Sequence, residues 1–257
     1  MDAFFSILSL PLFAIALCIA FFAGVIKGIV GFAMPMILLS GISTFADPEL
    51  ALAALILPTL VTNAMQALRY RLSDVWQTMK RFKVFLSVGA LMLFGAAQLV
   101  PVLPTNLLLL VIGLAVTCFA LWQLSGRAPE PGKWSQNKIL DVGIGAFAGL
   151  IGGLSGIWGP PTVAYLTAIG TPKKQQMLAQ GVIYGLGAIL LMLGHWKSGV
   201  INSATFPLSL SLLPPAVLGM WLGAQISDRF DQATFRKVTL LVLIIGGLNL
   251  LRRGLFG

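Results

Sequence analysis

The stretch AGVIKGIVGFAMP, residues 23–35, decides the fold, because glycines and a proline interrupt an otherwise apolar segment that holds one lysine. A second stretch, AGLIGGLSGIWGP at residues 148–160, repeats it 125 positions later. At this offset seven pairs are identical: Phe22 and Phe147, Ala23 and Ala148, Gly24 and Gly149, Ile26 and Ile151, Gly28 and Gly153, Gly31 and Gly156, and Pro35 and Pro160. The sequence therefore predicts an internal duplication, which is a signature of transporter folds.

The composition predicts a chain that lies in a membrane. Of the 257 residues, 58% are hydrophobic and 10% are charged, whereas soluble domains carry roughly 25% charged residues. Crossing a bilayer as a helix takes about 20 apolar residues. Such runs recur along the chain, at residues 4–22, 25–45, 50–68, 84–100, 106–122, 139–170, 177–194, 206–226 and 233–251. We predict an all-α polytopic membrane protein with eight to ten segments.

The net charge of +9 does not indicate a nucleic-acid partner, because the basic residues lie in short loops between apolar runs. There they report orientation. Cys18 and Cys118 fall inside apolar runs, and the chain has one histidine, so we expect no metal site and no cofactor. The partners we expect are a small anionic substrate and the lipid bilayer; the sequence is silent on oligomeric state.

The duplication divides the chain into a first repeat, residues 1–124, a linker, residues 125–138, and a second repeat, residues 139–257. The linker SGRAPEPGKWSQNK is the most polar and proline-bearing connection in the chain. We expect it to lie in the cytoplasm, because Arg127, Lys133 and Lys138 are basic.

The basic residues in the loops predict the orientation of the two repeats in the membrane. If each half crossed the membrane four times, eleven basic residues would lie inside and five outside, with Lys27 left in the membrane. If each glycine-rich segment folds back as a hairpin, the second half is inverted, and fourteen lie inside and three outside. The positive-inside rule favours the second arrangement. We predict inverted repeats, each a glycine-rich broken helix or hairpin plus three transmembrane helices, with the depth of the hairpins left open.

The glycine-rich stretches are expected to break their helices, since an interior glycine costs up to about 1 kcal/mol and a proline about 3 kcal/mol. In a membrane, broken backbone is tolerated where it is buried in protein or lines a cavity. Transporters use such breaks to direct half-helix N-termini at anions. We therefore expect the two breaks to meet near the midplane and enclose one site.

Lys27 indicates that the ligand carries a negative charge. A lysine amid apolar sequence costs about 2.5 to 3.5 kcal/mol on insertion scales. Two interpretations stay open: an anion compensates the charge, or the side chain snorkels to the cytoplasmic surface.

The predicted substrate-binding residues come from both stretches and from the helices that follow them: Lys27, Gly28, Gly31, Pro35, Asn63, Gly153, Ser155, Gly156, Trp158, Pro160, Thr162 and Gln180. Ser155, Trp158 and Thr162 would offer hydroxyl and indole donors. The competing interpretation is ordinary packing and hydrogen bonding between helices, for these three and for Asn63 and Gln180.

At these residues the chain resembles the sulfite exporter TauE/SafE family of bacterial inner-membrane permeases, which has two related halves, each opening with a stretch of the type AGxxxGxxGxxxxP. The resemblance covers essentially the whole chain. It implies a multi-pass protein of the bacterial inner membrane that moves sulfite, organosulfonates and related anions, usually outward. The family's usual third glycine is Ala33 in one copy and Trp158 in the other, so the pocket shape departs from that of common members.

Export needs no proton relay, and all eight acidic residues fall at helix ends or in loops. Expelling one negative charge from a cell with a negative interior gains about 2.3 kcal/mol per 100 mV.

The alternative to a transporter is an enzyme, an intramembrane serine protease. Residues 153–156 spell GxSG, the serine motif of rhomboid intramembrane proteases, and His195 is the one histidine. A serine and a histidine within hydrogen-bond reach can form a dyad. However, the duplication already accounts for the glycines, and the first copy has Val30 where Ser155 stands. We expect a transporter and no enzyme.

Overall fold

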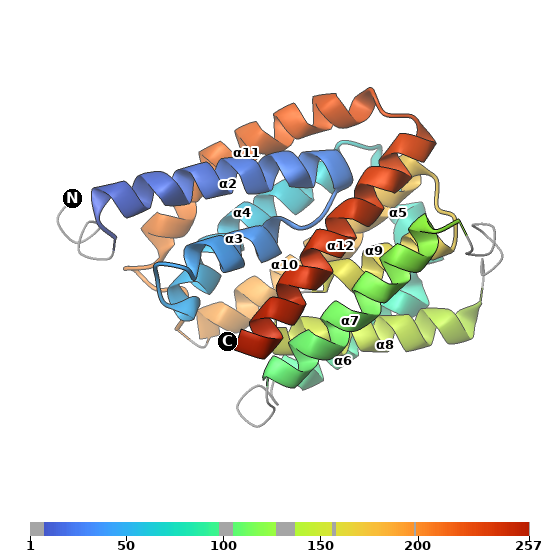
Figure 1. Cartoon of the computed structure of the whole chain (residues 1–257), viewed down its shortest axis with the longest axis horizontal. Coiled ribbons are helices and arrows are strands. Elements are labelled where there is room, and N and C mark those ends of the chain that lie inside the picture. The colour runs from blue at the N-terminus through green and yellow to red at the C-terminus, as the bar shows by residue number, and fades with distance from the viewer. Residues whose placement is uncertain (1–7, 98–104, 127–136, 156–157, 198, 257) are drawn as a thin grey trace. The chain divides into compact units, whose positions relative to one another are not determined.

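The computed structural model describes residues 8–97, 105–126, 137–155, 158–197 and 199–256, and these residues form eleven α-helices and no strand (Figure 1). The helices are α2 (Leu10–Val30), α3 (Met34–Ile42), α4 (Pro48–Leu68), α5 (Leu72–Arg81), α6 (Lys83–Ala97), α7 (Thr105–Leu124), α8 (Lys138–Ser155), α9 (Gly159–Ala168), α10 (Lys173–Lys197), α11 (Phe206–Asp228) and α12 (Gln232–Phe256).

The chain forms two compact units, and each combines segments from both halves of the sequence. The first unit comprises Met1–Arg69 and Gly181–Arg229, and the second comprises Tyr70–Gln180 and Phe230–Gly257. The predicted boundaries of the repeats stay a prediction. Most of the predicted linker, residues 127–136 with Arg127 and Lys133, lies outside the described residues.

In the first unit, α2 and α11 pack side by side through glycines. A Cβ atom on Gly28 would come within 2.7 Å of the Ala224 nitrogen, and one on Gly24 within 3.0 Å of the Met220 nitrogen. Gly219 and Gly223 of α11 face α2 with equally little space. Because the contacting residue numbers rise together, the two helices run parallel. Small residues four apart let membrane helices approach this closely.

The α2 helix reverses direction after Val30, and α3 returns along it. Gly41 near the end of α3 lies against the side chain of Ile19, half-way back along α2. The two helices therefore form an antiparallel hairpin, with α3 at nine residues shorter than α2 at 21 residues. The predicted break within residues 23–35 is thus confirmed, although Gly24 and Gly28 lie inside α2 and only the last part of the stretch is broken.

A proline interrupts α4, and a serine from α11 fills the gap in its hydrogen bonding. Pro58 has no N–H to offer to the carbonyl of Ala54, four residues earlier. Ser209 Oγ donates to that carbonyl at 3.1 Å and accepts the N–H of Leu57 at 3.1 Å. Ser209 therefore allows a buried helix to carry a proline in its middle.

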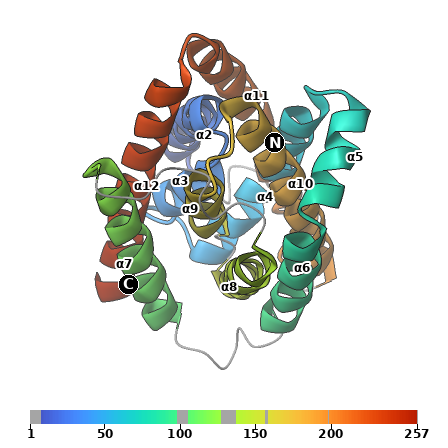
Figure 2. The same cartoon turned by 90° about the vertical axis from the view of Figure 1, so that its right-hand side faces the viewer.

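The second unit has two further glycine contacts. Gly145 of α8 faces Phe85 of α6, and Gly149 faces Gly89, so α6 and α8 run parallel. A Cβ atom on Gly113 of α7 would come within 2.7 Å of the carbonyl oxygen of Gly247 in α12. Figure 2 shows α7 and α12 side by side.

The direction of α7 and α12 follows from a second contact. Gly254, later in α12, faces Asn106 and Leu110, which lie earlier in α7 than Gly113 does. The contacting residue numbers therefore run in opposite senses, and α7 and α12 are antiparallel.

The apolar runs of the sequence did not predict α5, an amphipathic helix in which no residue is buried. Leu72 and Trp76 are 72% and 57% exposed on one face. Asp74, Gln77 and Arg81 follow at the spacing of the opposite face.

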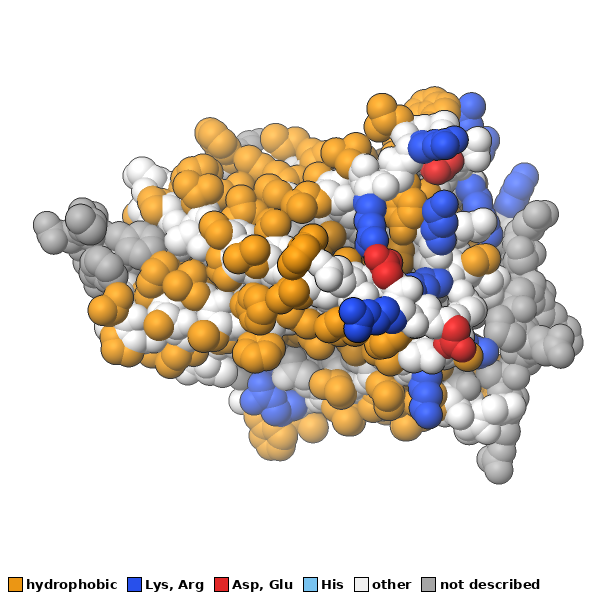
Figure 3. All heavy atoms as spheres, turned by 90° about the horizontal axis from the view of Figure 1, so that it is seen from above, with side chains coloured by type: hydrophobic (Ala, Val, Ile, Leu, Met, Phe, Trp, Pro, Cys, Tyr) orange, Lys and Arg blue, Asp and Glu red, His pale blue; other side chains and the backbone are white. Residues whose placement is uncertain are grey.

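The outer surface is largely hydrophobic, as Figure 3 shows for one face. Exposed apolar side chains include Phe22, Phe94, Trp221 and Ile245, which suits contact with lipid. Five helices among the described residues are long and apolar enough to cross a membrane: Leu10–Val30, Leu50–Leu68, Lys173–Trp196, Phe206–Asp228 and Gln232–Phe256, with Lys83–Ala96 as a shorter apolar helix. The polytopic helical class is confirmed, and the total of eight to ten segments stays a prediction.

Candidate functional site

Lys27 lies in the last turn of α2, and its side chain is 1% exposed. Its ammonium donates a hydrogen bond to Asn63 Oδ1 of α4, which is equally buried. Of the two interpretations from the sequence, snorkelling does not fit, because the side chain turns into the first unit. Lys27 and Asn63, two predicted site residues from different helices, are thus in direct side-chain contact.

Polar side chains of α4 surround this contact. Thr59 lies one turn before Asn63, and its buried hydroxyl has no hydrogen-bond partner among the described residues. Thr62 donates to the carbonyl of Pro58 at 2.6 Å and contacts the sulfur of Met34 at 3.9 Å. The polar face of α4 therefore reaches from Lys27 to the first residue of α3.

The break between α2 and α3 is built from two residues with left-handed backbone. Gly31 has φ 84°, and its N–H donates to the carbonyl of Lys27 at 2.7 Å. Ala33 has φ 75° and directly precedes α3. Glycine adopts such angles without strain, but alanine does so at a cost of about 1 kcal/mol or more.

The N-terminus of α3 is buried and has no side-chain cap. Ala33 at the N-cap position makes no side-chain hydrogen bond, and Met34 is fully buried. The first N–H groups of a helix have no acceptor within it and carry partial positive charge. Pro35 is at the second position of the helix, where its missing N–H breaks no helical hydrogen bond.

Among the side chains that the structure describes, no carboxylate pairs with the ammonium of Lys27. Within the described ranges, the one ion pair joins Arg69 Nη2 and Asp228 Oδ2 at 2.5 Å, and both side chains are about half exposed. The hydrogen-bond partner of Lys27 is a neutral amide. A buried cation beside an uncapped helix N-terminus is an arrangement that favours an anion.

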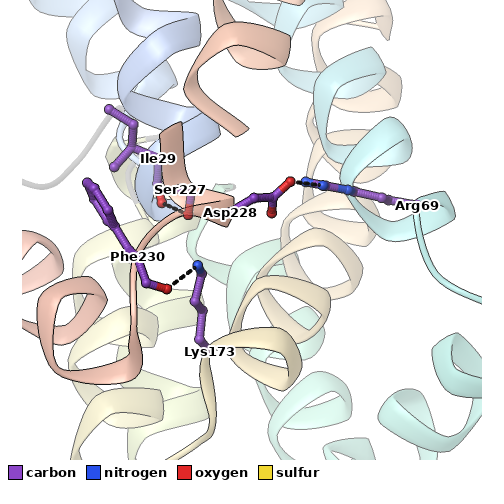
Figure 4. Close-up of polar contacts among 6 residues, drawn as sticks. All are labelled: Ile29, Arg69, Lys173, Ser227, Asp228 and Phe230. Carbon is purple, nitrogen blue, oxygen red and sulfur yellow. Dashed lines mark hydrogen bonds and ion pairs between the residues drawn. The ribbon is translucent and has the colours of Figure 1, made fainter. Parts of the chain in front are cut away.

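Two contacts join the ends of helices near this region of the first unit (Figure 4). Ser227 Oγ of α11 donates to the carbonyl of Ile29 in α2 at 2.8 Å. The Arg69–Asp228 ion pair links the end of α4 to the end of α11. The C-terminal ends of α2, α4 and α11 are therefore held together within one turn of Lys27.

Figure 4 also shows a contact within the second unit, between Lys173 and Phe230. Lys173 Nζ at the start of α10 donates to the carbonyl of Phe230 at 2.9 Å, and its backbone N–H donates to Gln232 Oε1 at 2.7 Å.

Among the residues that the structure describes, no group of three His, Cys, Asp or Glu side chains could hold a metal ion.

Two of the predicted residues have another role in the structure. Gly28 faces Met220 and Gly223 of α11, so its small size serves helix packing. Gly31 forms the turn and does not offer a side chain. Both contribute to the position of Lys27 through the backbone.

The second glycine-rich stretch lies in the second unit and forms the end of α8 and the start of α9. Gly156 lies outside the described residues, Gly153 lies within α8, and the side chain of Ser155 is not described. Trp158 is buried and packs against Gly152. The Thr162 hydroxyl already donates to the carbonyl of Trp158 at 2.9 Å.

Pro160 and Gln180 are buried as well, in α9 and α10. Their part in substrate binding, like that of Trp158 and Thr162, stays a prediction.

Sequence reasoning missed the contributions of Ser209 and Met34. A proline within a predicted helix implies an orphan carbonyl four residues earlier, so Pro58 was a usable signal for a donor such as Ser209. No local signal marked Met34, because its position depends on how the chain reverses.

These features define a class: a multi-pass helical membrane protein with a buried cation at a broken helix. The sequence matches the sulfite exporter TauE/SafE family over residues 16–250, and the chain belongs to that family. The family resemblance seen in the glycine-rich stretches is thereby confirmed.

A curated relative is the probable membrane transporter protein YunE of Bacillus subtilis (strain 168), which is 29% identical over 131 residues. The match covers 50% of this chain and 47% of that relative, so the chain spans about half of the relative's length. No solved structure matches. These matches support a transporter and give no support to the alternative of a protease that uses Ser155 and His195.

Proposed function

We propose that the protein exports small sulfur-containing anions, such as sulfite or organosulfonates, across the bacterial inner membrane by alternating access around Lys27. The observation that carries the proposal is the buried ammonium of Lys27, which has a neutral partner in Asn63 and an uncapped helix N-terminus close by. Family membership and the transporter relative support the class of function.

The chemistry of the site suits a compact oxyanion. An ammonium gives charge-assisted hydrogen bonds to an anionic oxygen, and these are about twice as strong as neutral ones. The first N–H groups of α3 supply further donors. The Thr59 hydroxyl, without a partner among the described residues, is one turn from Asn63 and can serve another oxygen.

The directions of the helices support inverted repeats. At the offset of the duplication, α2 corresponds to α8, and α7 and α12 are the last helices of their halves. Within their units, α2 runs parallel to α11, α8 runs parallel to α6, and α7 is antiparallel to α12. An in-plane two-fold relation between the halves would produce these directions, and inverted repeats are the usual frame of alternating access.

Outward movement of an anion agrees with the energetics. The membrane potential contributes about 2.3 kcal/mol per charge and 100 mV, which favours about fifty-fold accumulation outside. In the described part of the chain, the acidic residues Asp47, Asp74, Asp141, Asp228 and Asp231 lie at helix ends. We infer that the voltage drives transport.

Opening of the site requires a local change. The Ser227 contact with Ile29 and the Arg69–Asp228 ion pair hold three helix ends together beyond Lys27. We infer that both contacts break when the site opens toward that side. An exposed ion pair contributes about 0 to 1 kcal/mol, so such a closure is easily reversed.

The test is flux through purified protein in proteoliposomes with an imposed voltage of either sign. The panel contains sulfite, thiosulfate, an organosulfonate and chloride, with protein-free liposomes as the control. We expect voltage-dependent flux of the sulfur oxyanions, faster when the compartment of origin is negative. Equal flux of all four anions, or none, would contradict the proposal.

A further inference from the structure

A polar pocket that Lys27 does not line lies between α5 and the first turns of α10 in the second unit. Its volume is about 290 Å³. The polar residues that line it are Tyr70, Asp74, Gln77, Thr78, Arg81, Lys174 and Gln175. Thus two cations and one carboxylate face the same small space.

Contacts with neighbouring side chains hold both cations in place. Arg81 Nη1 donates to Gln175 Oε1 at 2.8 Å, and its guanidinium lies 5.2 Å from the ring centroid of Phe82. Lys174 Nζ lies 5.9 Å from the ring centroid of Tyr70. A guanidinium has five N–H donors, and in the described part of the chain Arg81 uses one hydrogen bond, so donors remain for a ligand.

The pocket lies on the polar face of α5. Asp74, Gln77 and Arg81 recur at helical spacing, and the exposed Leu72 and Trp76 occupy the opposite face. Tryptophan is enriched at membrane–water interfaces. The helix therefore separates lipid on its apolar face from a cationic pocket on the other.

Asp74 narrows the chemistry of the ligand. A carboxylate repels an anion that has only acceptor oxygens, but it accepts a hydrogen bond from a hydroxyl group. A ligand that satisfies all three charged residues has anionic oxygens for Arg81 and Lys174 and a hydroxyl donor for Asp74. Hydrogen phosphate has both groups, and so does the glycerol-bearing headgroup of phosphatidylglycerol.

We propose that this pocket binds a phosphate group that carries a hydroxyl donor, either free in solution or in a lipid headgroup. Basic pockets at the cytoplasmic side of membrane helices commonly bind phospholipid headgroups. The site is distinct from the proposed transport site, so its failure would leave the function at Lys27 untouched.

The test uses the purified full-length protein in detergent. Binding of phosphatidylglycerol and of phosphatidylcholine is measured by native mass spectrometry, and binding of inorganic phosphate and of sulfate by calorimetry. We expect tighter binding of phosphatidylglycerol than of phosphatidylcholine, or tighter binding of phosphate than of sulfate. Phosphatidylglycerol binding alone identifies a lipid site, and phosphate binding alone identifies a soluble ligand.

Substitutions of the residues that line the pocket test whether the ligand binds there. Arg81→Gln with Lys174→Gln should weaken binding by about fivefold for each charge removed. The matched control is Lys80→Gln with Lys83→Gln, which removes two nearby charges that do not line the pocket and should change binding less than twofold. Gln77→Trp fills the pocket at an exposed position while keeping both cations, and it should also weaken binding.

Three outcomes would overturn the proposal: no binding of either phosphate probe, equal loss in the control pair, or undiminished binding in Gln77→Trp. A further check is Asp74→Asn, which should reduce the discrimination between phosphate and sulfate.

Discussion

Ser209 donates a hydrogen bond to the carbonyl of Ala54, the oxygen that Pro58 leaves without a helical partner in α4. We predict that Ser209→Ala destabilises the protein, because this carbonyl loses its donor and the N–H of Leu57 loses the Ser209 oxygen as an acceptor. An unsatisfied buried polar group costs about 1 to 3 kcal/mol. The measurement is the apparent Tm of the purified protein in detergent.

Ser211→Ala is the matched control for this serine. Ser211 lies on the same helix, and its hydroxyl donates to the carbonyl of Leu208 within α11. We expect little change in Tm. Equal loss in both variants would show that Ser209 does not act through the gap at Pro58.

Lys27→Met should abolish most anion transport while leaving the fold intact. The substitution removes a charge-assisted hydrogen bond to substrate, worth about 1.5 to 3 kcal/mol, so the apparent affinity should fall ten- to hundredfold. Stability should stay equal or rise, since replacing a buried charge by an apolar side chain relieves its desolvation. Flux in proteoliposomes and Tm in detergent measure the two effects.

Lys80→Gln controls for the loss of one positive charge, since Lys80 is exposed on α5, above the ring of Trp76. Its flux should match that of the unaltered protein. Unchanged affinity and rate in Lys27→Met would remove Lys27 from the transport site.

Gly24→Ala should push α2 away from α11 and thereby lower the Tm of the protein in detergent. An added Cβ atom would meet the backbone of Ala216 and Met220, which cannot move without shifting the whole helix. Overpacking of this kind typically costs about 1 to 3 kcal/mol.

Gly95→Ala is the helical control, because a Cβ atom there meets nothing within 4 Å. Alanine is the better helix former by up to about 1 kcal/mol, so Tm should stay or rise. If both glycine variants lowered Tm alike, close approach of α2 and α11 would not be the reason.

Inverted repeats make a prediction about labelling from the two sides of the membrane. Asp47 and Pro172 are 125 positions apart, as the glycine-rich stretches are, and both are exposed. We predict that Asp47→Cys reacts with an impermeant thiol reagent from outside and Pro172→Cys from inside. The background carries Cys18→Ser and Cys118→Ser, because both native cysteines are exposed.

Labelling of Asp47→Cys and Pro172→Cys from the same side would indicate halves of equal orientation. That result would contradict inversion without affecting the assignment to the family.

The sequence predicted the helical class and the break, because apolar length and glycine with proline are local properties. It also placed Lys27 and Asn63 in one predicted site; the structure joins their side chains by a hydrogen bond, and substrate binding by either stays a prediction. The packing of Gly28 against α11 was not predictable, since sequence alone does not show which helices become neighbours, and its part in substrate binding stays a prediction. The helix α5 was missed because ten residues are too short for a search based on membrane-spanning length.

Ala33 has a positive φ of 75° at the turn that leads into α3. An L-residue with a Cβ atom does not adopt this angle by preference, so its own backbone does not specify the turn. The surrounding side chains, which leave Ala33 almost fully buried, hold the conformation instead. The chain reversal beside Lys27 is thus a property of the packed first unit, and a peptide of residues 23–42 alone would not keep it.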